Sequence, residues 1–537
     1  MKILACFFKK LFQHGISFFW FNLSYTIFVL AVCNLHFFKK LWMVAPTWGF
    51  LVSVICFLLV FLSFHALLFW PLITKFLAGF FLLGNAVASY FIGTYNVLLN
   101  KTMLMNVVDT NMAEASDFFN MSFLGHIVLV GIVPLIFICF LKIKYDSPFR
   151  ELRHRIGVIT ITLIIVAMAI LPQKKEFKVF LRENFNLRYQ LLPTSYVSSA
   201  VGVFNILFIK KAIIEDVSKG LTVDHYRSDD KKNLIVFVLG ESARDANFSL
   251  TGYLRDTNAP LLPYLNELTV FKKTISCGVV TRVSLPCMFS HYKREEYQAD
   301  QISYTENVLD LIKKGGYFVK WIENEIGCSK VCRRVETQYT CQDRDCFDEK
   351  LNHVFKEQVK QLSQDSVFVL HQRGSHGTLY HKRYPANFER YKPVCRHSEI
   401  GRCAYDEVVN AYDNTIYYTS FLLADLIKYL KTLTDRFNPV LIYVSDHGES
   451  LGEQGSMLHG GDWDKAPEYQ KQVPFFIWMP DSSKQAFKIN SECLKKQTKT
   501  QKSHDYIFHS LLGLSGVFVD VYDPNLDLFG ICRNKEK

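Results

Sequence analysis

Five long apolar stretches occupy the first third of the chain. A bilayer core about 30 Å thick is crossed by about 20 apolar residues in a helix, so each stretch has the length of a membrane span. The first stretch is too long for the apolar region of a signal peptide and lacks a small-residue cleavage site. A buried core helix is the alternative for the shortest stretch, 156–171. We therefore expect an N-terminal all-α transmembrane bundle of five helices over residues 1–172. The stretches are 16–38, 49–70, 76–98, 122–141 and 156–171.

The charges that flank these stretches indicate how the chain is oriented. Short cytoplasmic loops carry an excess of Lys and Arg. Lysines precede the first stretch, and the segment between the fourth and fifth is strongly basic, whereas the connection between the third and fourth is acidic on balance. Lys39 and Lys40 do not fit this pattern. The N-terminus is therefore expected in the cytoplasm, and five crossings place everything after about residue 172 outside.

The cysteines test that placement independently. Fourteen are present, four of them in the membrane third, and the other ten include eight in close sequence pairs. Even, clustered cysteines suit an oxidising compartment. Structural zinc sites are the alternative, although the spacings differ and no histidine lies among them in a finger-like pattern. Nearest-neighbour pairing is the simplest hypothesis for Cys277, Cys287, Cys328, Cys332, Cys341, Cys346, Cys395, Cys403, Cys493 and Cys532.

The net charge of +11 does not indicate a nucleic-acid-binding protein. Much of the basic excess lies beside the apolar stretches, and no module that interleaves aromatic and basic residues is evident. Attraction to anionic lipid surfaces accounts for it better. Membrane lipids, and no nucleic acid, are the expected partners.

Residues 173–230 join the membrane third to the rest of the chain. Between residues 177 and 192 apolar residues recur at helical spacing among basic ones, as in a helix that lies in the membrane interface. The stretch 197–211 has the same character, and a polar hinge follows at 224–232. Helices packed on the following domain are the alternative interpretation.

Short apolar runs alternate with helical stretches from residue 234 onward. LIVFVLG at 234–240, VFVLH at 367–371 and VLIYV at 440–444 are typical of buried parallel strands. Helices are expected at 303–315 and 405–432. This alternation predicts an α/β sheet with helices on both faces, in a second domain over residues 231–537.

Acidic and imidazole side chains come directly after these three strands. In open α/β sheets, ligands bind beyond the carboxyl ends of the strands. Glu, Asp and His are suitable zinc ligands. An Asp-His pair alone is more often a turn, but together with the other strand ends it favours a metal site. The residues in question are Glu241, the segment HQRGSHG (371–377) with His376, the turn Asp446, His447 and Glu449, and His459.

The segment SCGVVTRVSLPCMFS (276–290) offers a hydroxyl group to this site. A hydroxyl that ligates zinc is easier to deprotonate and becomes a competent nucleophile toward phosphorus. Thr281 and Ser284 are the candidates, since both lie between Cys277 and Cys287. A bridge between these cysteines holds the loop rigid, as a nucleophile requires. An ordinary disulfide-stapled loop is the alternative.

Five segments of the sequence match one known family: 238–262, 276–290, 371–388, 411–415 and 443–455. They closely resemble the lipid A phosphoethanolamine transferases, which are membrane-anchored members of the alkaline phosphatase superfamily; some confer polymyxin resistance. The resemblance extends over nearly the whole chain, including the five spans. It implies an alkaline phosphatase/sulfatase-like C-terminal domain, in the periplasm of a bacterium, on a multi-pass inner-membrane protein. The five cysteine pairs agree with a disulfide-rich catalytic domain of this family.

The resemblance also implies roles for individual residues. Thr281 matches the nucleophile that carries phosphoethanolamine covalently, and one or two zinc ions are expected. The matching zinc ligands are Glu241, Thr281, Asp446 and His447. The residues that match phosphate or second-zinc positions are His376 and His459, and Glu449 looks like another active-site residue. Positions associated with the donor headgroup are Asn106, Thr110 and Glu114.

One loop departs from the family pattern. It reads WIENEIGCSKVC, with Glu325 where related proteins often have Asn, and Lys330 is displaced by one residue. Lys330 is retained as a candidate phosphate contact.

The expected reaction is a ping-pong transfer from phosphatidylethanolamine to a lipid A phosphate through Thr281, with His376 or His459 as the acid or base. A core sugar of lipopolysaccharide is an alternative acceptor. Phosphoglycerol transfer and sulfatase-type hydrolysis are the nearest rival reactions, although the sulfatase modification motif is absent near Thr281. A catalytically silent lipid-binding protein is the rival outside enzymes.

Overall fold

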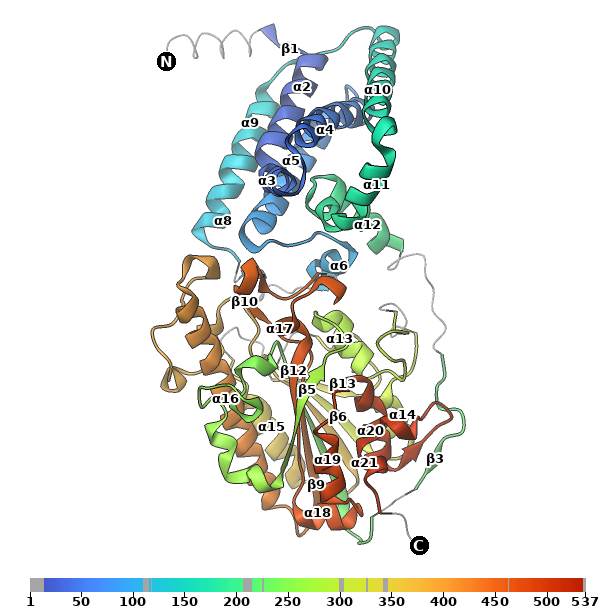
Figure 1. Cartoon of the computed structure of the whole chain (residues 1–537), viewed down its shortest axis with the longest axis vertical. Coiled ribbons are helices and arrows are strands. Elements are labelled where there is room, and N and C mark those ends of the chain that lie inside the picture. Colours follow the sequence, from blue (N-terminus) through green and yellow to red (C-terminus); the bar gives the residue numbers. More distant parts are fainter. Residues whose placement is uncertain are drawn as a thin grey trace. The chain divides into compact units, whose positions relative to one another are not determined.

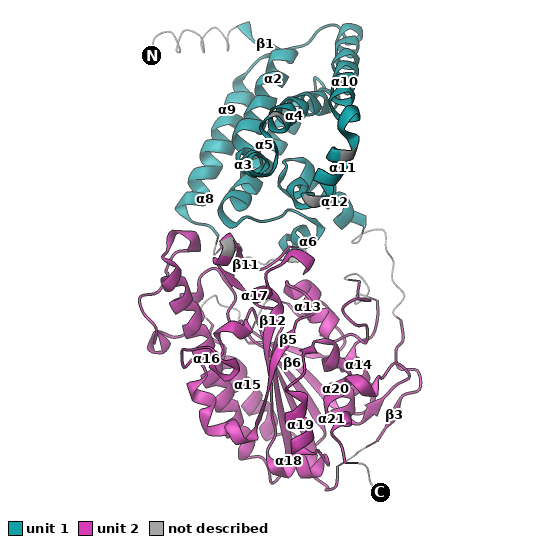
Figure 2. Cartoon of the chain, in the orientation of Figure 1, with its two compact units in different colours: residues 1–108, 118–207 teal, residues 109–117, 208–537 magenta. Residues whose placement is uncertain are grey.

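The computed structural model describes residues 14–109, 115–116, 118–205, 215–224, 227–298, 304–324, 327–340, 346–461 and 463–534. The chain divides into two compact units (Figure 2). Unit 1 comprises residues 1–108 and 118–207, and unit 2 comprises residues 109–117 and 208–537.

Unit 1 is built from helices (Figure 1). In the described part of the chain, four helices are long and apolar enough to cross a membrane. Their outer surfaces carry exposed apolar side chains such as Phe140 and Leu163, which lipid rather than water would solvate. These helices are α4 (Thr47–Leu68), α5 (Thr74–Tyr95), the continuous pair α8 (Met121–His126) and α9 (Val133–Phe140) with the π-helical turn Ile127–Ile132 between them, and α10 (Pro148–Ile170).

The first apolar stretch is bent instead of straight. Helix α2 (Phe18–Phe28) continues through a π-helical turn to Cys33, and α3 (Leu35–Val44) leaves it at 68°. At the bend, the Asn34 side chain donates to the carbonyl of Leu192 (3.0 Å) and accepts from its N–H (2.7 Å). The membrane unit therefore has up to five spans, with the bent pair counted as one. Lys39 and Lys40 lie on α3, beyond the bend, and so do not mark the end of a straight span.

Short helices follow the last span. They are α11 (Lys174–Glu183), a 3-10 segment (Phe185–Gln190) and α12 (Thr194–Phe204). Residues 206–214 and 225–226 of the connecting region lie outside the described residues. A position of α11 in the membrane interface remains a prediction.

An eight-stranded sheet forms the centre of unit 2, in the order β13-β5-β12-β9-β4-β8-β6-β7. The sheet is mixed, because β12 runs antiparallel to both β9 and β5. The strands from β9 to β7 are parallel to one another, as the apolar runs predict. Their bounds are β4 Lys232–Gly240, β5 Leu268–Ile275, β6 Phe318–Glu323, β7 Glu336–Tyr339, β8 Ser366–His371, β9 Phe437–Ser445, β12 Gln472–Trp478 and β13 Lys502–Ser503.

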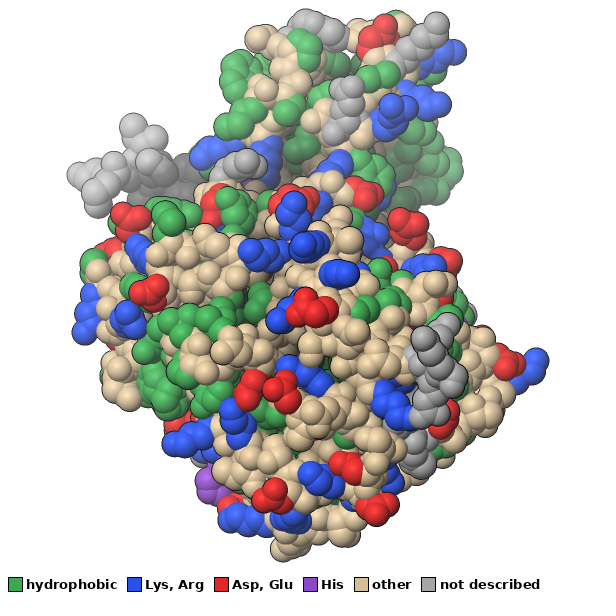
Figure 3. Space-filling view, turned by 60° about the horizontal axis from the view of Figure 1, so that its bottom comes forward, with side chains coloured by type: hydrophobic (Ala, Val, Ile, Leu, Met, Phe, Trp, Pro, Cys, Tyr) green, Lys and Arg blue, Asp and Glu red, His purple; other side chains and the backbone are tan. Residues whose placement is uncertain are grey.

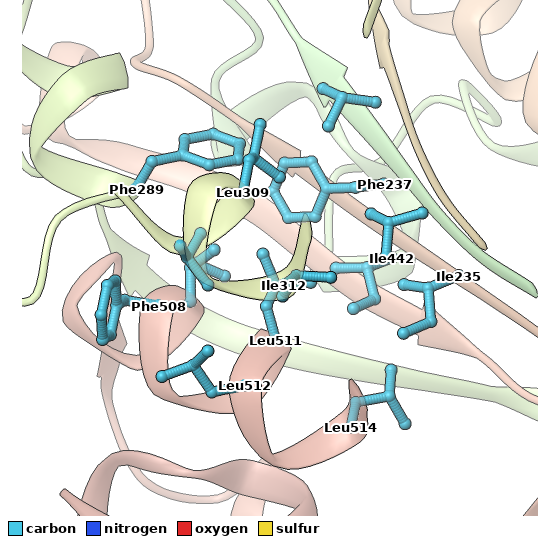
Figure 4. Close-up of a cluster of buried hydrophobic side chains, with 14 of the residues drawn as sticks. Ile235, Phe237, Phe289, Leu309, Ile312, Ile442, Phe508, Leu511, Leu512 and Leu514 are labelled. Atoms are coloured by element: carbon cyan, nitrogen blue, oxygen red, sulfur yellow. The ribbon is translucent and has the colours of Figure 1, made fainter. Parts of the chain in front are cut away.

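Helices cover both faces of this sheet, so its central strands are buried on both sides. Ile235, Phe237 and Leu239 of β4 belong to one core, and Val236 and the other alternate residues belong to the opposite core. Figure 4 shows the first core, where Phe237 lies beside Leu309. The first face is covered by α13 (Thr281–Met288), α14 (Val308–Lys314), α20 (Asp505–Ser515) and α21 (Leu528–Ile531), and the second by α15 (Glu349–Lys360) and α16 (Tyr405–Lys431).

The outer surface differs from this interior. On the face shown in Figure 3, basic and acidic side chains are interspersed. Mixed charge of this kind is typical of a surface exposed to water.

The register of the parallel strands brings their carboxyl ends to one edge. Gly240 at the end of β4 pairs with Ser445 at the end of β9, and Leu239 pairs with His371 at the end of β8. The residue that follows each strand is therefore placed at the same edge of the sheet.

Candidate active site

Four of the predicted site residues meet at this edge. The Thr281 hydroxyl oxygen lies 3.1 Å from Oε2 of Glu241 and 3.2 Å from Nε2 of His447. The same imidazole nitrogen lies 3.5 Å from Oε1 of Glu241 and 3.4 Å from Oδ2 of Asp446. Glu241, Asp446 and His447 are each fully buried, with ligand atoms within 4.8 Å of one another. The structure thus brings together the predicted nucleophile and the predicted metal ligands.

Backbone geometry after β4 fixes the Glu241 carboxylate. Ser242 adopts a left-handed conformation with φ of 55°, which is strained for a residue other than glycine. Two hydrogen bonds hold it there: its hydroxyl donates to Oε1 of Glu241 (2.7 Å), and its N–H donates to Oδ1 of Asp446 (3.2 Å). The sharp turn therefore joins the two carboxylates directly.

The turn after β9 orients the imidazole of His447. Its Nδ1 lies 2.8 Å from the carbonyl oxygen of Gly448, so Nδ1 carries the proton and donates it. Nε2 is then left with its lone pair directed at Thr281 and Glu241. Burial lowers the pKa of His447 to about 4, against the opposing effect of Asp446. The ring is therefore neutral at neutral pH, the form in which histidine binds metals.

The loop after β8 packs closely against the same turn. Gly374 has φ of +50°, and a Cβ at this position would lie 2.7 Å from the carbonyl oxygen of Glu241. The N–H of Ser375 donates to that carbonyl at 2.9 Å. A residue without a side chain is required here, which explains the glycine of the HQRGSHG segment.

The donor set at this edge fits a divalent cation. Two carboxylates are buried beside one neutral imidazole, and burying such charge without compensation is costly. Oδ2 of Asp446 is buried and has no hydrogen-bond partner in the described part of the chain. Carboxylate, imidazole and hydroxyl donors in one buried cluster match the ligand preference of zinc. Glu241, Asp446, His447 and Thr281 are therefore the residues that could hold the ion.

The two candidate hydroxyls of the 276–290 segment have different environments. Thr281 is the first residue of α13, where the helix dipole stabilises negative charge. Ser284 is fully buried one turn later, and its hydroxyl donates to the backbone carbonyl of Asp446. The Thr281 hydroxyl faces the ligand cluster, whereas the Ser284 hydroxyl is engaged in fixing the backbone.

A disulfide closes the loop that carries Thr281. Cys277 and Cys287 are bonded across ten residues, and both are buried. We expect the Cys277→Ser/Cys287→Ser double variant to lose about 3 kcal/mol of stability, because a ring of this size restricts the unfolded chain. Thermal unfolding of the oxidised protein and the double variant measures the loss. The Cys395→Ser/Cys403→Ser variant is the matched control, because it opens a ring of similar size and should lose a similar amount of stability. An unfolding temperature of the Cys277→Ser/Cys287→Ser variant equal to that of the wild type would contradict the prediction.

The other cysteines follow the nearest-neighbour hypothesis where they are described. The structure contains the bridges Cys328–Cys332, Cys395–Cys403 and Cys493–Cys532. Cys341 lies outside the described residues, so its expected bridge to Cys346 stays a prediction.

A second group of predicted residues lies beside the ligand cluster. The ring of His459 lies 4.2 Å from that of His447 and 5.8 Å from that of His376, measured between centroids. Nδ1 of His459 lies 3.2 Å from Oε2 of the buried Glu449. Burial, followed by the charges of His459, Arg383 and Arg373, lowers the pKa of His376 well below its ordinary value. His376 is therefore neutral at neutral pH.

Lys330 lies in a basic environment. Burial lowers its pKa, and the neighbouring Arg333 and Arg282 lower it further. Arg282 directly follows Thr281 in α13. A role for Lys330 as a phosphate contact remains a prediction. Glu325 lies outside the described residues.

The predicted headgroup residues lie elsewhere in the chain. Asn106 is in α6 (Lys101–Asp109). Thr110 and Glu114 lie outside the described residues. A role for these three in binding the donor headgroup remains a prediction.

Sequence reasoning missed several residues that build the site. Asp348 accepts from the N–H groups of Arg373 and Gly374, both at 2.9 Å, and so shapes the loop that carries His376. Glu323, at the end of β6, forms a buried contact of 2.8 Å with His371, the first residue of the segment 371–377 that the sequence singled out. His504 contacts the Thr281 loop from the far end of the chain. No local motif marks Asp348 or His504, because each acts through backbone groups distant in the sequence.

Comparisons with known proteins agree with this architecture. A family model described as "Phosphoethanolamine transferase EptA/EptB" matches residues 55–206, and one described as "Sulfatase" matches residues 233–517. Phosphoethanolamine transferase EptA of Escherichia coli (strain K12) is 33% identical over 94% of this chain and 95% of that protein. Phosphatidylethanolamine transferase Mcr-1 of Escherichia coli is 32% identical over 93% of this chain and 94% of that protein.

A solved structure also matches nearly the whole chain. It is the integral membrane protein lipooligosaccharide phosphoethanolamine transferase A (EptA) from Neisseria meningitidis. The TM-score is 0.92 at 28% identity, and the match covers 96% of this chain and 98% of that one.

Proposed function

This chain belongs to the phosphoethanolamine transferases, and from that premise we propose that it transfers phosphoethanolamine from phosphatidylethanolamine to a lipid A phosphate through a covalent intermediate on Thr281. The observation that carries the proposal is the position of the Thr281 hydroxyl, 3.1 Å from Glu241 and 3.2 Å from His447. The names of the relatives support the two substrates: one is a phosphatidylethanolamine transferase, and another acts on lipooligosaccharide.

The first half-reaction loads Thr281. The Thr281 oxygen forms a bond to the phosphorus of the donor, and the bond from phosphorus to the diacylglycerol oxygen breaks. One proton leaves the threonine hydroxyl, and one is gained by diacylglycerol. Glu241 accepts a hydrogen bond from the hydroxyl and orients it. Glu241, Asp446, His447 and Thr281 would hold a zinc ion. When bound, it would supply positive charge that favours the deprotonated hydroxyl and offsets charge on the phosphoryl oxygens.

The second half-reaction unloads Thr281 onto the acceptor. A phosphate oxygen of lipid A bonds to phosphorus, the bond to the Thr281 oxygen breaks, and the threonine regains a proton. His376 or His459 carries the proton from the acceptor to the Thr281 oxygen; burial keeps the His376 ring neutral at neutral pH by lowering its pKa. Glu449 fixes the ring of His459 through Nδ1 and so orients the imidazole beside His447 and His376. Lys330 is retained as the candidate contact of the same phosphate, and Arg282 lies close enough to lower its pKa.

The location of the reaction follows from the topology. We place the protein in the bacterial inner membrane, with the N-terminus in the cytoplasm and the catalytic unit in the periplasm. The basic connection before α10 supports the orientation. The disulfides of unit 2 support an oxidising compartment for that unit.

Mass spectrometry of lipid A tests the proposed function. We expect lipid A from cells that express the protein to gain phosphoethanolamine on a phosphate, and lipid A from cells without it to lack this addition. Phosphoethanolamine found only on core sugars would show that a core sugar of lipopolysaccharide, and not a lipid A phosphate, is the acceptor. No gain on any glycolipid, with the protein folded in the membrane, would refute the proposal.

A further inference from the structure

A buried histidine outside the ligand set connects the Thr281 loop to the metal-ligand turn. His504 precedes α20 and is 1% exposed. Its Nδ1 lies 3.1 Å from the backbone nitrogen of Cys277, and its Nε2 lies 3.0 Å from the carbonyl oxygen of Ser445. One imidazole therefore joins the residue that starts the nucleophile loop to the residue that precedes Asp446.

The directions of these bonds define the state of the ring. The Cys277 N–H can only donate, so Nδ1 is the unprotonated acceptor, and Nε2–H donates to the Ser445 carbonyl. Burial lowers the pKa of His504 to about 4, against the opposing effect of Asp446. The neutral ring with its proton on Nε2 satisfies both backbone groups.

Two further contacts strengthen the connection. The N–H of His504 donates to the carbonyl of Ile275, the last residue of β5, at 3.0 Å. The hydroxyl oxygen of Ser284 lies 3.3 Å from Nδ1 of His504, and the same hydroxyl donates to the backbone carbonyl of Asp446. His504 and Ser284 thus tie α13, which begins at Thr281, to the end of β9.

We infer that His504 is a positioning residue for the transfer reaction. It fixes the position of the Thr281 hydroxyl relative to Asp446 and His447, and it does not itself bind a substrate. The inference rests on the proposed function for the identity of the reaction. It follows from the two-sided bonding of the ring, because loss of either bond lets the nucleophile loop move relative to the ligand turn. Displacements of about 1 Å at a reacting group lower rates by about 100-fold.

Three substitutions at His504 separate the two bonds. His504→Phe keeps an aromatic ring of similar size and removes both bonds. His504→Asn places an amide oxygen near Nδ1, and His504→Gln places an amide nitrogen near Nε2, so each keeps one bond. We expect kcat to fall by about 10- to 100-fold in the Phe variant and by less in the Asn and Gln variants. KM for phosphatidylethanolamine should stay within about twofold, since the His504 ring is 1% exposed and so is not accessible to the lipid.

His509, on the helix α20 that follows His504, offers a matched control. It is 3% exposed, and its Nδ1 lies 3.0 Å from the backbone nitrogen of Asp523, away from the site. His509→Phe should destabilise the protein and leave kcat unchanged. Equal losses of kcat in His504→Phe and His509→Phe, or an unchanged kcat in His504→Phe, would overturn the inference.

Zinc affinity gives a second readout that does not depend on activity. Chelator competition on the full-length protein should show about 10-fold weaker zinc binding in His504→Phe than in the wild type, and no change in His509→Phe. If the wild type transfers no phosphoethanolamine, the proposed function fails, while this measurement still decides the role of His504: equal zinc affinity in the two Phe variants would refute it.

Discussion

The Thr281→Ala variant is expected to form no covalent adduct with phosphoethanolamine and to lose transfer activity by about 10³-fold or more. Removal of a nucleophile leaves only binding and electrostatic stabilisation to accelerate the reaction. The purified protein is incubated with labelled phosphatidylethanolamine, and intact-protein and peptide mass spectrometry locate the label. In the wild type the label should be on the peptide that contains Thr281.

Two controls make this experiment decisive. Thr281→Ser keeps a hydroxyl at the same position on α13 and should retain a detectable adduct. Ser284→Ala removes the other hydroxyl of the loop; because that hydroxyl donates to the Asp446 carbonyl, the variant should be less active yet still labelled on Thr281. An undiminished adduct in Thr281→Ala would assign the nucleophile to another residue.

The positions of three strands of unit 2 could be predicted from the local sequence pattern, but the directions of all the strands could not. The apolar runs at 234–240, 367–371 and 440–444 correspond to β4, β8 and β9. A strand buried on both faces gives a continuous apolar run whichever way it points. The antiparallel direction of β12 (QVPFFIW) is set by its partners β5 and β9, which no single segment reveals.

The candidate site could be predicted only in part from the sequence. Glu241, Asp446 and His447 could be placed together because each follows a strand of one parallel set, and parallel strands end at one edge. Thr281 and Ser284 could not be separated, since both lie between the same two cysteines. Their difference arises in three dimensions, where the Ser284 hydroxyl meets a backbone carbonyl 162 residues away.

The bend in the first apolar stretch could not be predicted from composition. The stretch 16–38 is apolar throughout, so hydropathy alone predicts one straight helix. The bend at Asn34 depends on hydrogen bonds to Leu192, which lies far along the chain. A polar side chain inside an apolar stretch was the available signal, because such a group needs a partner within the membrane.

Removal of the metal is expected to abolish activity and to lower the unfolding temperature of the catalytic unit. A ligand that binds only the folded state stabilises it by about 4 kcal/mol at a free concentration 1,000 times its Kd, which corresponds to roughly 5–10 °C for a domain of this size. Differential scanning calorimetry with and without a chelator measures the shift. Zinc added back should restore both properties, and an enzyme that keeps full activity after its metal content reaches zero would contradict the assignment.

The Asp446→Asn variant separates the metal ligand from the fold. With zinc present the variant should unfold at a clearly lower temperature than the wild type, because it has lost a charged ligand. With chelator present the difference should shrink, because no cation is then left for the Asp446 carboxylate to bind. Oδ2 of Asp446 is the buried oxygen that has no hydrogen-bond partner in the described part of the chain and is therefore the atom assigned to the cation. If the variant is less stable by the same margin under both conditions, the Asp446 carboxylate stabilises the fold without a cation and is not a metal ligand.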